Sequence, residues 1–198
     1  TVPVPIQTSQ GRSYVHADGC LWELTPWMGG QADYRHAPSR SRIAAAMTAL
    51  ADFHRAASDF APTRSTSVAA PAVLERLTIL SDLTGGGYQR IVAAVRCDRQ
   101  HGDSLWTHDA ERILSLFAKL ALRVDRQLVE AQRLSVPLQP VIRDIWHDHV
   151  LFHGETVTGF VDFGAMRHDS VAVDISRLLG SLVGDDEHPV LRPHALDL

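Results

Sequence analysis

Residues 141–174 read VIRDIWHDHVLFHGETVTGFVDFGAMRHDSVAVD, and this stretch decides the fold. Asp144 follows a short apolar run, and Asp162 closes a second run of β-like character. Between them, residues 153–156 have the composition of a hairpin turn. A hairpin over residues 150–161 could bring both carboxylates to the same end of a small sheet. Two carboxylates so placed suit either general-base catalysis or the binding of a divalent cation.

Apolar residues on both sides of this stretch recur at helical spacing. One amphipathic helix carries Ile43 to His54 and has Ser39 or Ser41 as its N-cap. The longest helix is expected to begin at the N-cap Thr107 and to end before Pro137. Three further helices are predicted over residues 67–83 (ended by the glycines 85–87), 88–97 and 170–183.

The start of the chain predicts a β-hairpin. Residues 13–24 place the turn pair Asp18-Gly19 between two apolar or aromatic segments. Residues 25–30 (TPWMGG) then break the strand pattern, as a linker between structural units does. We therefore expect two lobes, with the boundary between residues 1–28 and residues 29–198.

The composition narrows the class of partner. The 198 residues carry 19 basic and 23 acidic side chains and a formal net charge of −4. This balance does not suggest nucleic acid or an anionic membrane as the default partner. The two cysteines, Cys20 and Cys97, match no zinc spacing and no disulfide framework, and the most apolar stretches fall far short of the roughly 20 residues that span a bilayer. We expect a cytoplasmic protein, and the sequence does not indicate its oligomeric state.

Four segments resemble one family in the same order along the chain. They are residues 22–30 (WELTPWMGG), 47–54 (MTALADFH), 142–152 (IRDIWHDHVLF) and 161–164 (VDFG). Together they resemble the aminoglycoside phosphotransferase and choline kinase group of small-molecule kinases. The resemblance implies an α+β protein of the protein-kinase-like fold. It would consist mainly of the helical C-terminal lobe, with a short catalytic hairpin and a remnant of the N-terminal lobe sheet.

The same resemblance assigns roles to individual residues. Asp144, with Arg143 beside it, matches the catalytic aspartate that orients the substrate hydroxyl, and Asp162 matches the aspartate that holds Mg²⁺ at the ATP phosphates. Asp174 matches an aspartate of structural role. His149 stands where the family has an asparagine that binds a second metal ion, and imidazole suits Mn²⁺ or Zn²⁺ better than Mg²⁺. Residues of the interlobe hinge are expected to bind adenine: Glu23, Leu24, Thr25, Trp27 and Met28.

The implied activity is ATP-dependent phosphoryl transfer to a hydroxyl group of a small molecule. The residues before Ser13 hold no glycine-rich phosphate loop and no strand lysine, and the only lysine, Lys119, lies in a predicted helix. The chain therefore reads as a fragment that lacks most of the nucleotide lobe and is truncated at its C-terminus, and the alternative is a naturally shortened relative that no longer transfers phosphate. We expect it to be inactive by itself.

Two other functions stay open at this point. The first is a catalytically silent module that uses a kinase-like pocket to bind a ligand or partner. The second is a metal-dependent hydrolase, because several histidines and an aspartate gather in one part of the sequence. These residues are His147, Asp148, His149, His153 and His168.

Overall fold

The computed structural model describes residues 2–60, 69–99 and 105–182. The chain forms two compact units, one made of Thr1–Thr63 with Gln139–Leu198 and the other of Arg64–Leu138. Helices and short antiparallel strands are both present, which confirms the α+β class. The lobe boundary after Met28 stays a prediction.

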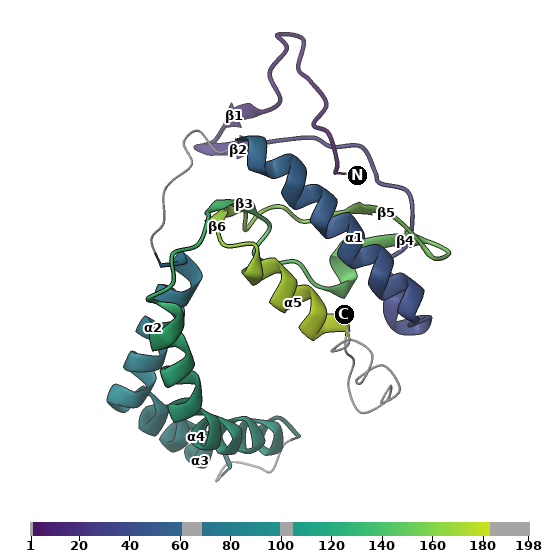
Figure 1. The fold of residues 1–198 in the computed structure, drawn as a ribbon. Helices are drawn as coiled ribbons and strands as arrows, with labels where there is room; N and C mark the ends of the chain where they lie inside the picture. The colour runs from purple at the N-terminus through teal and green to yellow at the C-terminus, as the bar shows by residue number, and fades with distance from the viewer. Residues whose placement is uncertain (1, 61–68, 100–104, 183–198) are drawn as a thin grey trace. The chain divides into compact units, whose positions relative to one another are not determined.

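The first unit holds three two-stranded antiparallel sheets (Figure 1). They pair β1 (Val15–Ala17) with β2 (Cys20–Trp22), β3 (Gln139–Val141) with β6 (Arg167–Asp169), and β4 (Val150–His153) with β5 (Thr156–Phe160). Both predicted hairpins are confirmed, with tight turns at Asp18-Gly19 and Gly154-Glu155. Strand β6 was missed because its sequence, Arg-His-Asp, lacks the apolar alternation by which strands are predicted.

Helices cover the β4–β5 hairpin and build the core of this unit. They are α1 (Arg40–Ala57) and α5 (Ala172–Leu182), with short 3₁₀ turns at Tyr34–His36, Ser58–Phe60 and His147–His149. Ser39 caps α1 as predicted, because its hydroxyl accepts a hydrogen bond from the Arg42 N–H at 3.1 Å. The helix predicted over 170–183 is confirmed up to Leu182, and residue 183 lies outside the described residues. The core contains Tyr34, Ile43, Ala46, Leu50, Ile142, Ile145, Val150, Phe152, Phe160, Leu178 and Leu182.

The segment after the predicted hinge is fixed onto the β4–β5 hairpin. The backbone of Gln31 exchanges two hydrogen bonds of 2.9 Å with Phe152, and the Thr158 hydroxyl donates one to the Gly29 carbonyl at 2.6 Å. Gly30 has φ +110°, and a Cβ at this position would lie 2.2 Å from the Thr158 Oγ1. Only glycine fits here without a shift of the backbone or of Thr158. The glycine pair therefore allows the segment after the hinge to pack closely on the β4–β5 hairpin. It also breaks the strand pattern, as predicted.

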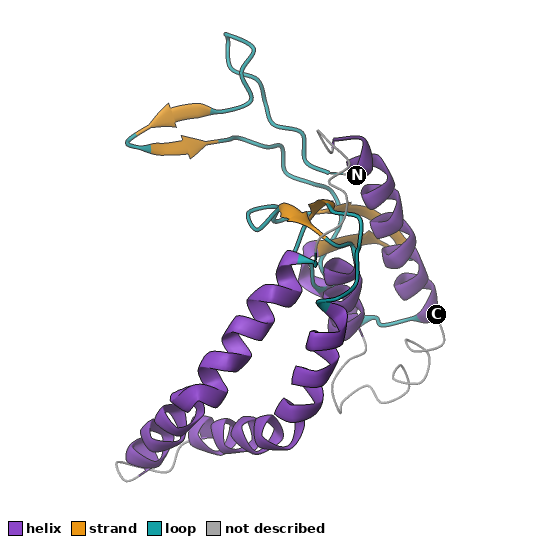
Figure 2. Cartoon of the chain, turned by 60° about the vertical axis from the view of Figure 1, so that its left-hand side comes forward, coloured by secondary structure: helices purple, strands orange, loops and turns teal. Residues whose placement is uncertain are grey.

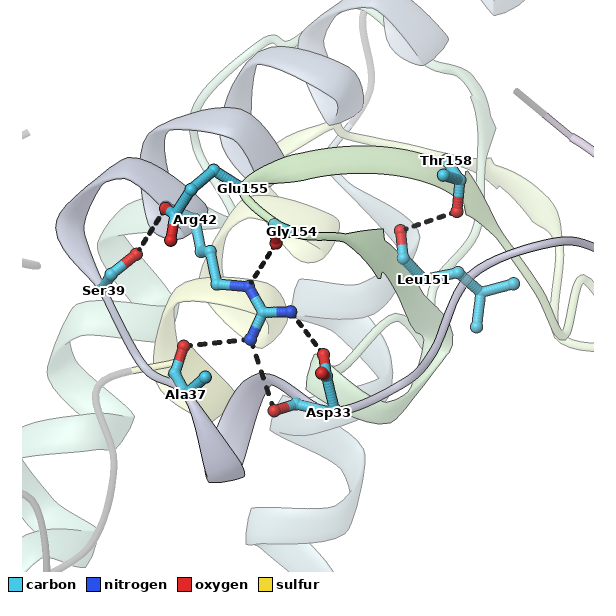
Figure 3. A network of polar contacts seen from close by, with 8 residues as sticks. All are labelled: Asp33, Ala37, Ser39, Arg42, Leu151, Gly154, Glu155 and Thr158. Carbon is cyan, nitrogen blue, oxygen red and sulfur yellow. Dashed lines mark hydrogen bonds and ion pairs between the residues drawn. The ribbon is translucent and has the colours of Figure 1, made fainter.

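Arg42 holds the start of α1 against the hairpin turn (Figure 3). Its side chain is 3% exposed, and its guanidinium donates to the carbonyls of Gly154 (3.0 Å) and Ala37 (2.9 Å). It also pairs with the Asp33 carboxylate and lies 4.3 Å from the centre of the Phe152 ring. One buried cation thus connects a helix, a loop and a β-hairpin.

The described residues of the second unit are mainly helical, and a turn and loop over residues 132–138 follow the last helix (Figure 2). It contains α2 (Pro71–Asp82), a helical turn over Leu83–Gly87, α3 (Tyr88–Arg99) and α4 (Leu105–Ala131). Tyr88 of α3 stacks on Phe117 of α4, with ring centres 5.3 Å apart.

Three boundaries in this unit differ from the predictions. Helix α2 begins at Pro71 and not at residue 67; residues 67 and 68 lie outside the described residues. The glycines 85–87 bend the chain at Gly86 (φ +119°), and α3 follows without a loop. Thr107 is buried inside α4 and is not its N-cap, because Leu105 and Trp106 are compatible with the first helical turn.

Candidate functional site

A cleft of about 1030 Å³ lies in the first unit between the predicted hinge and the loop after β5. Its lining includes Asp162 and the hinge residues Glu23, Thr25, Trp27 and Met28. Leu24 is not among the lining residues; its carbonyl accepts a hydrogen bond from the Ile6 N–H at 2.7 Å. The volume is at the upper end of the range of about 300–1,000 Å³ found for small-molecule sites. The cleft is also lined by Pro3, Pro26, Gly30, Gln31, Ala32, Leu151, Val161, Phe163, Gly164 and Met166.

Asp162 lines this cleft and has a backbone conformation that non-glycine residues rarely adopt. It stands just after β5 with φ +64°, in the left-handed region, and its side chain is 59% exposed. The Gly164 N–H donates to Oδ1 at 3.3 Å. Residues held in this region cluster at functional sites. Asp162 is therefore an accessible oxygen donor held at the edge of the cleft.

Asp144 lies in the loop between β3 and β4 and forms an ion pair with Arg177 of α5. The Arg177 guanidinium donates to the Asp144 Oδ1, and the Asp144 side chain is 52% exposed. Arg143 is adjacent to Asp144 in the chain but directs its side chain elsewhere, with Nε 3.7 Å from the Asp169 Oδ2. The charged partner of Asp144 is thus Arg177, which the sequence analysis did not single out.

Asp174 is fully buried and holds the backbone that leads into this loop. Its Oδ2 accepts from the Ile142 N–H at 2.8 Å and contacts the His54 Nε2 at 2.8 Å, while its Oδ1 accepts from the Arg143 N–H. Arg143 has φ +67°, so the chain turns sharply just before Asp144. The expectation that Asp174 is structural accords with these contacts. Helices α1 and α5 together fix where Asp144 stands.

The two predicted functional aspartates follow strands of different sheets. Asp144 comes after β3, which pairs with β6, and Asp162 comes after β5, which pairs with β4. The prediction that both lie at the end of one shared sheet is therefore wrong, because the β4–β5 hairpin does not include β3. His149 connects them instead: its Nδ1 lies 2.8 Å from the Asp144 carbonyl oxygen and its Nε2 lies 3.6 Å from the Asp162 Oδ2.

Trp146 is a third partner of the His149 ring. Its indole N–H donates to the His149 Nε2 at 2.7 Å, and the two rings meet edge to face. Because an indole nitrogen only donates, Nε2 must carry a lone pair. The Asp144 carbonyl only accepts, so the proton is on Nδ1. These two contacts select the neutral Nδ1–H tautomer of His149.

His147 belongs to the core and not to the cleft. Its side chain is 2% exposed, and its Nε2 lies 3.2 Å from the Asp148 Oδ1 without a hydrogen bond between them in the described residues. Burial lowers the pKa of the imidazole below its usual value. Within residues 2–60, 69–99 and 105–182, no group of three or more His, Cys, Asp or Glu side chains is placed to hold a metal ion. These observations do not favour the histidine-based hydrolase.

Arg177 and Trp146 are the site residues that sequence reasoning missed. Arg177 lies three residues after Asp174 on one helix, so the two share a face, and this spacing was a usable signal. Trp146 had only its place between Asp144 and His149 to single it out.

The model of a phosphotransferase enzyme family matches residues 1–197, so the chain belongs to that family. The family has the protein-kinase-like fold, which confirms the predicted family and fold class. No curated protein matches the chain. Among the helices in the described ranges, none combines the length and the apolar character needed to cross a membrane.

Proposed function

We propose that this phosphotransferase transfers the γ-phosphoryl group of ATP to a hydroxyl group of a small molecule in the cytoplasm, with Mg²⁺ as cofactor. The observation that carries the proposal is the position of Asp162. Its exposed carboxylate lines the same cleft as the hinge residues, and His149 links it to the loop of Asp144. A nucleotide site and a hydroxyl-orienting aspartate would thus lie next to each other.

The lining of the cleft suits an adenine ring and the phosphates of a nucleotide. The apolar side chains of Met28, Leu151, Val161 and Met166 offer surfaces on which a flat base packs. The backbone over residues 23–28 lies in neither helix nor strand and offers N–H and carbonyl groups for the edge of the base, apart from the Leu24 carbonyl, which accepts from Ile6. Trp27, 98% exposed, is free to cover the base. Asp162, which lines the same cleft, would face the phosphates.

Magnesium fits the chemistry of Asp162. Mg²⁺ is held in phosphotransfer sites by one or two carboxylates together with substrate phosphates and water. The bound ion neutralises charge on the transferring phosphoryl group. The role of His149 as a second metal ligand stays a prediction, because Trp146 holds the Nε2 lone pair that a cation needs.

Asp144 would accept a hydrogen bond from the acceptor hydroxyl and orient it towards the γ-phosphorus. Its Oδ1 accepts from Arg177, so the Oδ2 is the oxygen left to face a substrate. The Asp174 contacts keep the preceding backbone in place, which keeps the carboxylate in position. Positioning of this kind accounts for much of the catalysis in phosphoryl transfer.

A binding test comes before a turnover test, because the sequence holds no glycine-rich loop ahead of the hinge. Titration of the chain with ATP and Mg²⁺, followed by calorimetry, is expected to show binding that weakens at least several-fold in Asp162→Asn. Transfer of ³²P from ATP to a panel of hydroxyl compounds then tests the reaction, and we expect no transfer by this chain alone. ATP binding that is feeble and identical in Asp162→Ala would contradict the proposal.

A silent binding module is the second candidate, and one observation favours it. Two of the three side chains assigned to substrate or metal already have protein partners, Arg177 for Asp144 and Trp146 for His149. A module of this kind would bind its ligand without any requirement for a divalent cation. Cation dependence of binding therefore separates the two functions.

A further inference from the structure

The hydrogen bond between Trp146 and His149 occupies the atom that a metal ion would use. An imidazole binds a metal through a nitrogen lone pair. In His149 the Nδ1 is protonated and directed at the Asp144 carbonyl, so only Nε2 is available, and Trp146 donates to it at 2.7 Å. The imidazole side chain is 15% exposed. The indole N–H thus satisfies Nε2 as a hydrogen-bond acceptor without a water molecule.

The spacing of Nε2 and Asp162 nevertheless suits a shared cation. The His149 Nε2 and the Asp162 Oδ2 are 3.6 Å apart. Two metal–ligand bonds of about 2.1 Å can span up to about 4.2 Å, so the distance between the two atoms allows one ion to contact both. The obstacle is the indole N–H and not the distance.

We propose that Trp146 is a lock on the metal position: a cation held by Asp162 gains His149 as a ligand only when the indole N–H leaves Nε2. This inference rests on the proposed metal role of Asp162. The ion that displaces the indole is one that accepts imidazole more readily than Mg²⁺ does, such as Mn²⁺ or Zn²⁺, because Mg²⁺ gains little from a nitrogen ligand. Trp146, 39% exposed, has a solvent-accessible surface and is not confined to the core.

The lock predicts which variants change the affinity for metal. Trp146→Phe keeps an aromatic ring and removes the donor, so Nε2 is freed. The affinity for Mn²⁺ is expected to rise about 3- to 10-fold, the factor that corresponds to the net contribution of one hydrogen bond. The affinity for Mg²⁺ is expected to stay within twofold. In a His149→Ala background, Trp146→Phe is expected to have no effect on Mn²⁺.

The experiment measures free Mn²⁺ by electron paramagnetic resonance, in the full chain and without nucleotide. Trp22→Phe is the matched control, because the Trp22 indole N–H also donates to a protein acceptor, the Ala17 carbonyl at 3.3 Å, but far from Asp162 in the sequence. An unchanged Mn²⁺ affinity in Trp146→Phe would overturn the lock. So would an equal gain in the absence of His149, or the absence of Mn²⁺ binding in both proteins.

A second measurement on the unmodified chain does not depend on how the variant folds. The indole ¹H–¹⁵N signal of Trp146, assigned by its absence in Trp146→Phe, is followed during titration with Zn²⁺. We expect the signal to move as the hydrogen bond to imidazole is lost, and a signal that stays in place while Zn²⁺ binds would contradict the proposal. Since no ATP is present in either measurement, failure of the lock and failure of the ATP test are separate results.

Discussion

The carboxylate of Asp174 accepts a hydrogen bond of 2.6 Å from the backbone N–H of Arg143, the residue before Asp144. The same carboxylate accepts from Ile142 and contacts His54, so it joins α1, α5 and the loop between β3 and β4. No part of Asp174 reaches the cleft, because the residue is fully buried. It acts on the proposed reaction only by holding the backbone that carries Asp144.

Removal of the Asp174 carboxylate is expected to be costly. Asp174→Ala leaves two backbone N–H groups and the His54 ring without their buried acceptor, which should lower the free energy of unfolding by about 3 kcal/mol or more. Urea denaturation followed by circular dichroism measures this loss. Asp52→Ala is the control, since the Asp52 side chain is 60% exposed and pairs only with Arg55 on the surface. A cost below about 1 kcal/mol for Asp174→Ala would show that the carboxylate does not hold the loop.

Replacement of Asp144, unlike that of Asp174, should have little effect on the free energy of unfolding. Its ion pair with Arg177 is about half exposed on both sides, and pairs of this kind contribute about 0–1 kcal/mol. Asp144→Asn is therefore expected to change the free energy of unfolding by less than about 1 kcal/mol. The same urea experiment tests this, with Arg177→Gln as the partner variant. A large loss in Asp144→Asn would assign the residue to stability and weaken its proposed catalytic role.

Arg42 is expected to resist replacement by lysine. A lysine keeps the charge but cannot donate to the Gly154, Ala37 and Asp33 acceptors at once, because these bonds need the planar fork of the guanidinium. Arg42→Lys should lower the free energy of unfolding by about 2–4 kcal/mol, close to the loss for Arg42→Met. Thermal unfolding of both variants gives the comparison. Full stability in Arg42→Lys would show that charge alone is sufficient at this position.

Glu155 makes the stability of the fold depend on pH in the acidic range. Hydrogen bonds from the hydroxyls of Ser41 and Ser39 hold the pKa of this carboxyl below its usual value of 4.5. Since the folded pKa is depressed, the contribution of Glu155 is complete above about pH 4.5 and is lost as the pH falls towards the folded pKa. Glu155→Gln should therefore be less stable than the parent near pH 7 and approach it at low pH. A stability difference that does not change with pH would contradict this assignment.

The elements fixed by local pattern could be predicted, and the contacts between distant elements could not. The two tight turns and the Ser39 cap follow from residues close together in the sequence. Strand β6 and the Arg177–Asp144 pair depend on residues about 30 positions apart that the tertiary fold brings together. The candidate site shows the same division.

The positions of Asp144 and Asp162 relative to secondary structure were predicted, but their connection was not. The hairpin pattern gave no information on β3, which pairs with a polar strand that lies 28 residues further on. His149 was expected near the metal from its place in the motif. That its ring would bridge Asp144 and Asp162, and that Trp146 would cover one nitrogen, depends on side-chain geometry that spacing alone does not define.

Nucleotide binding in the cleft is the central claim, and the most direct test maps where ATP contacts the chain. ¹H–¹⁵N spectra of the full chain, recorded during titration with ATP and Mg²⁺, report on each backbone amide. We predict that the shifted signals gather at residues 23–28 and 161–164, and that the second group no longer shifts in Asp162→Asn. Shifts confined to other parts of the chain, or a pattern unaffected by Asp162→Asn, would contradict the account.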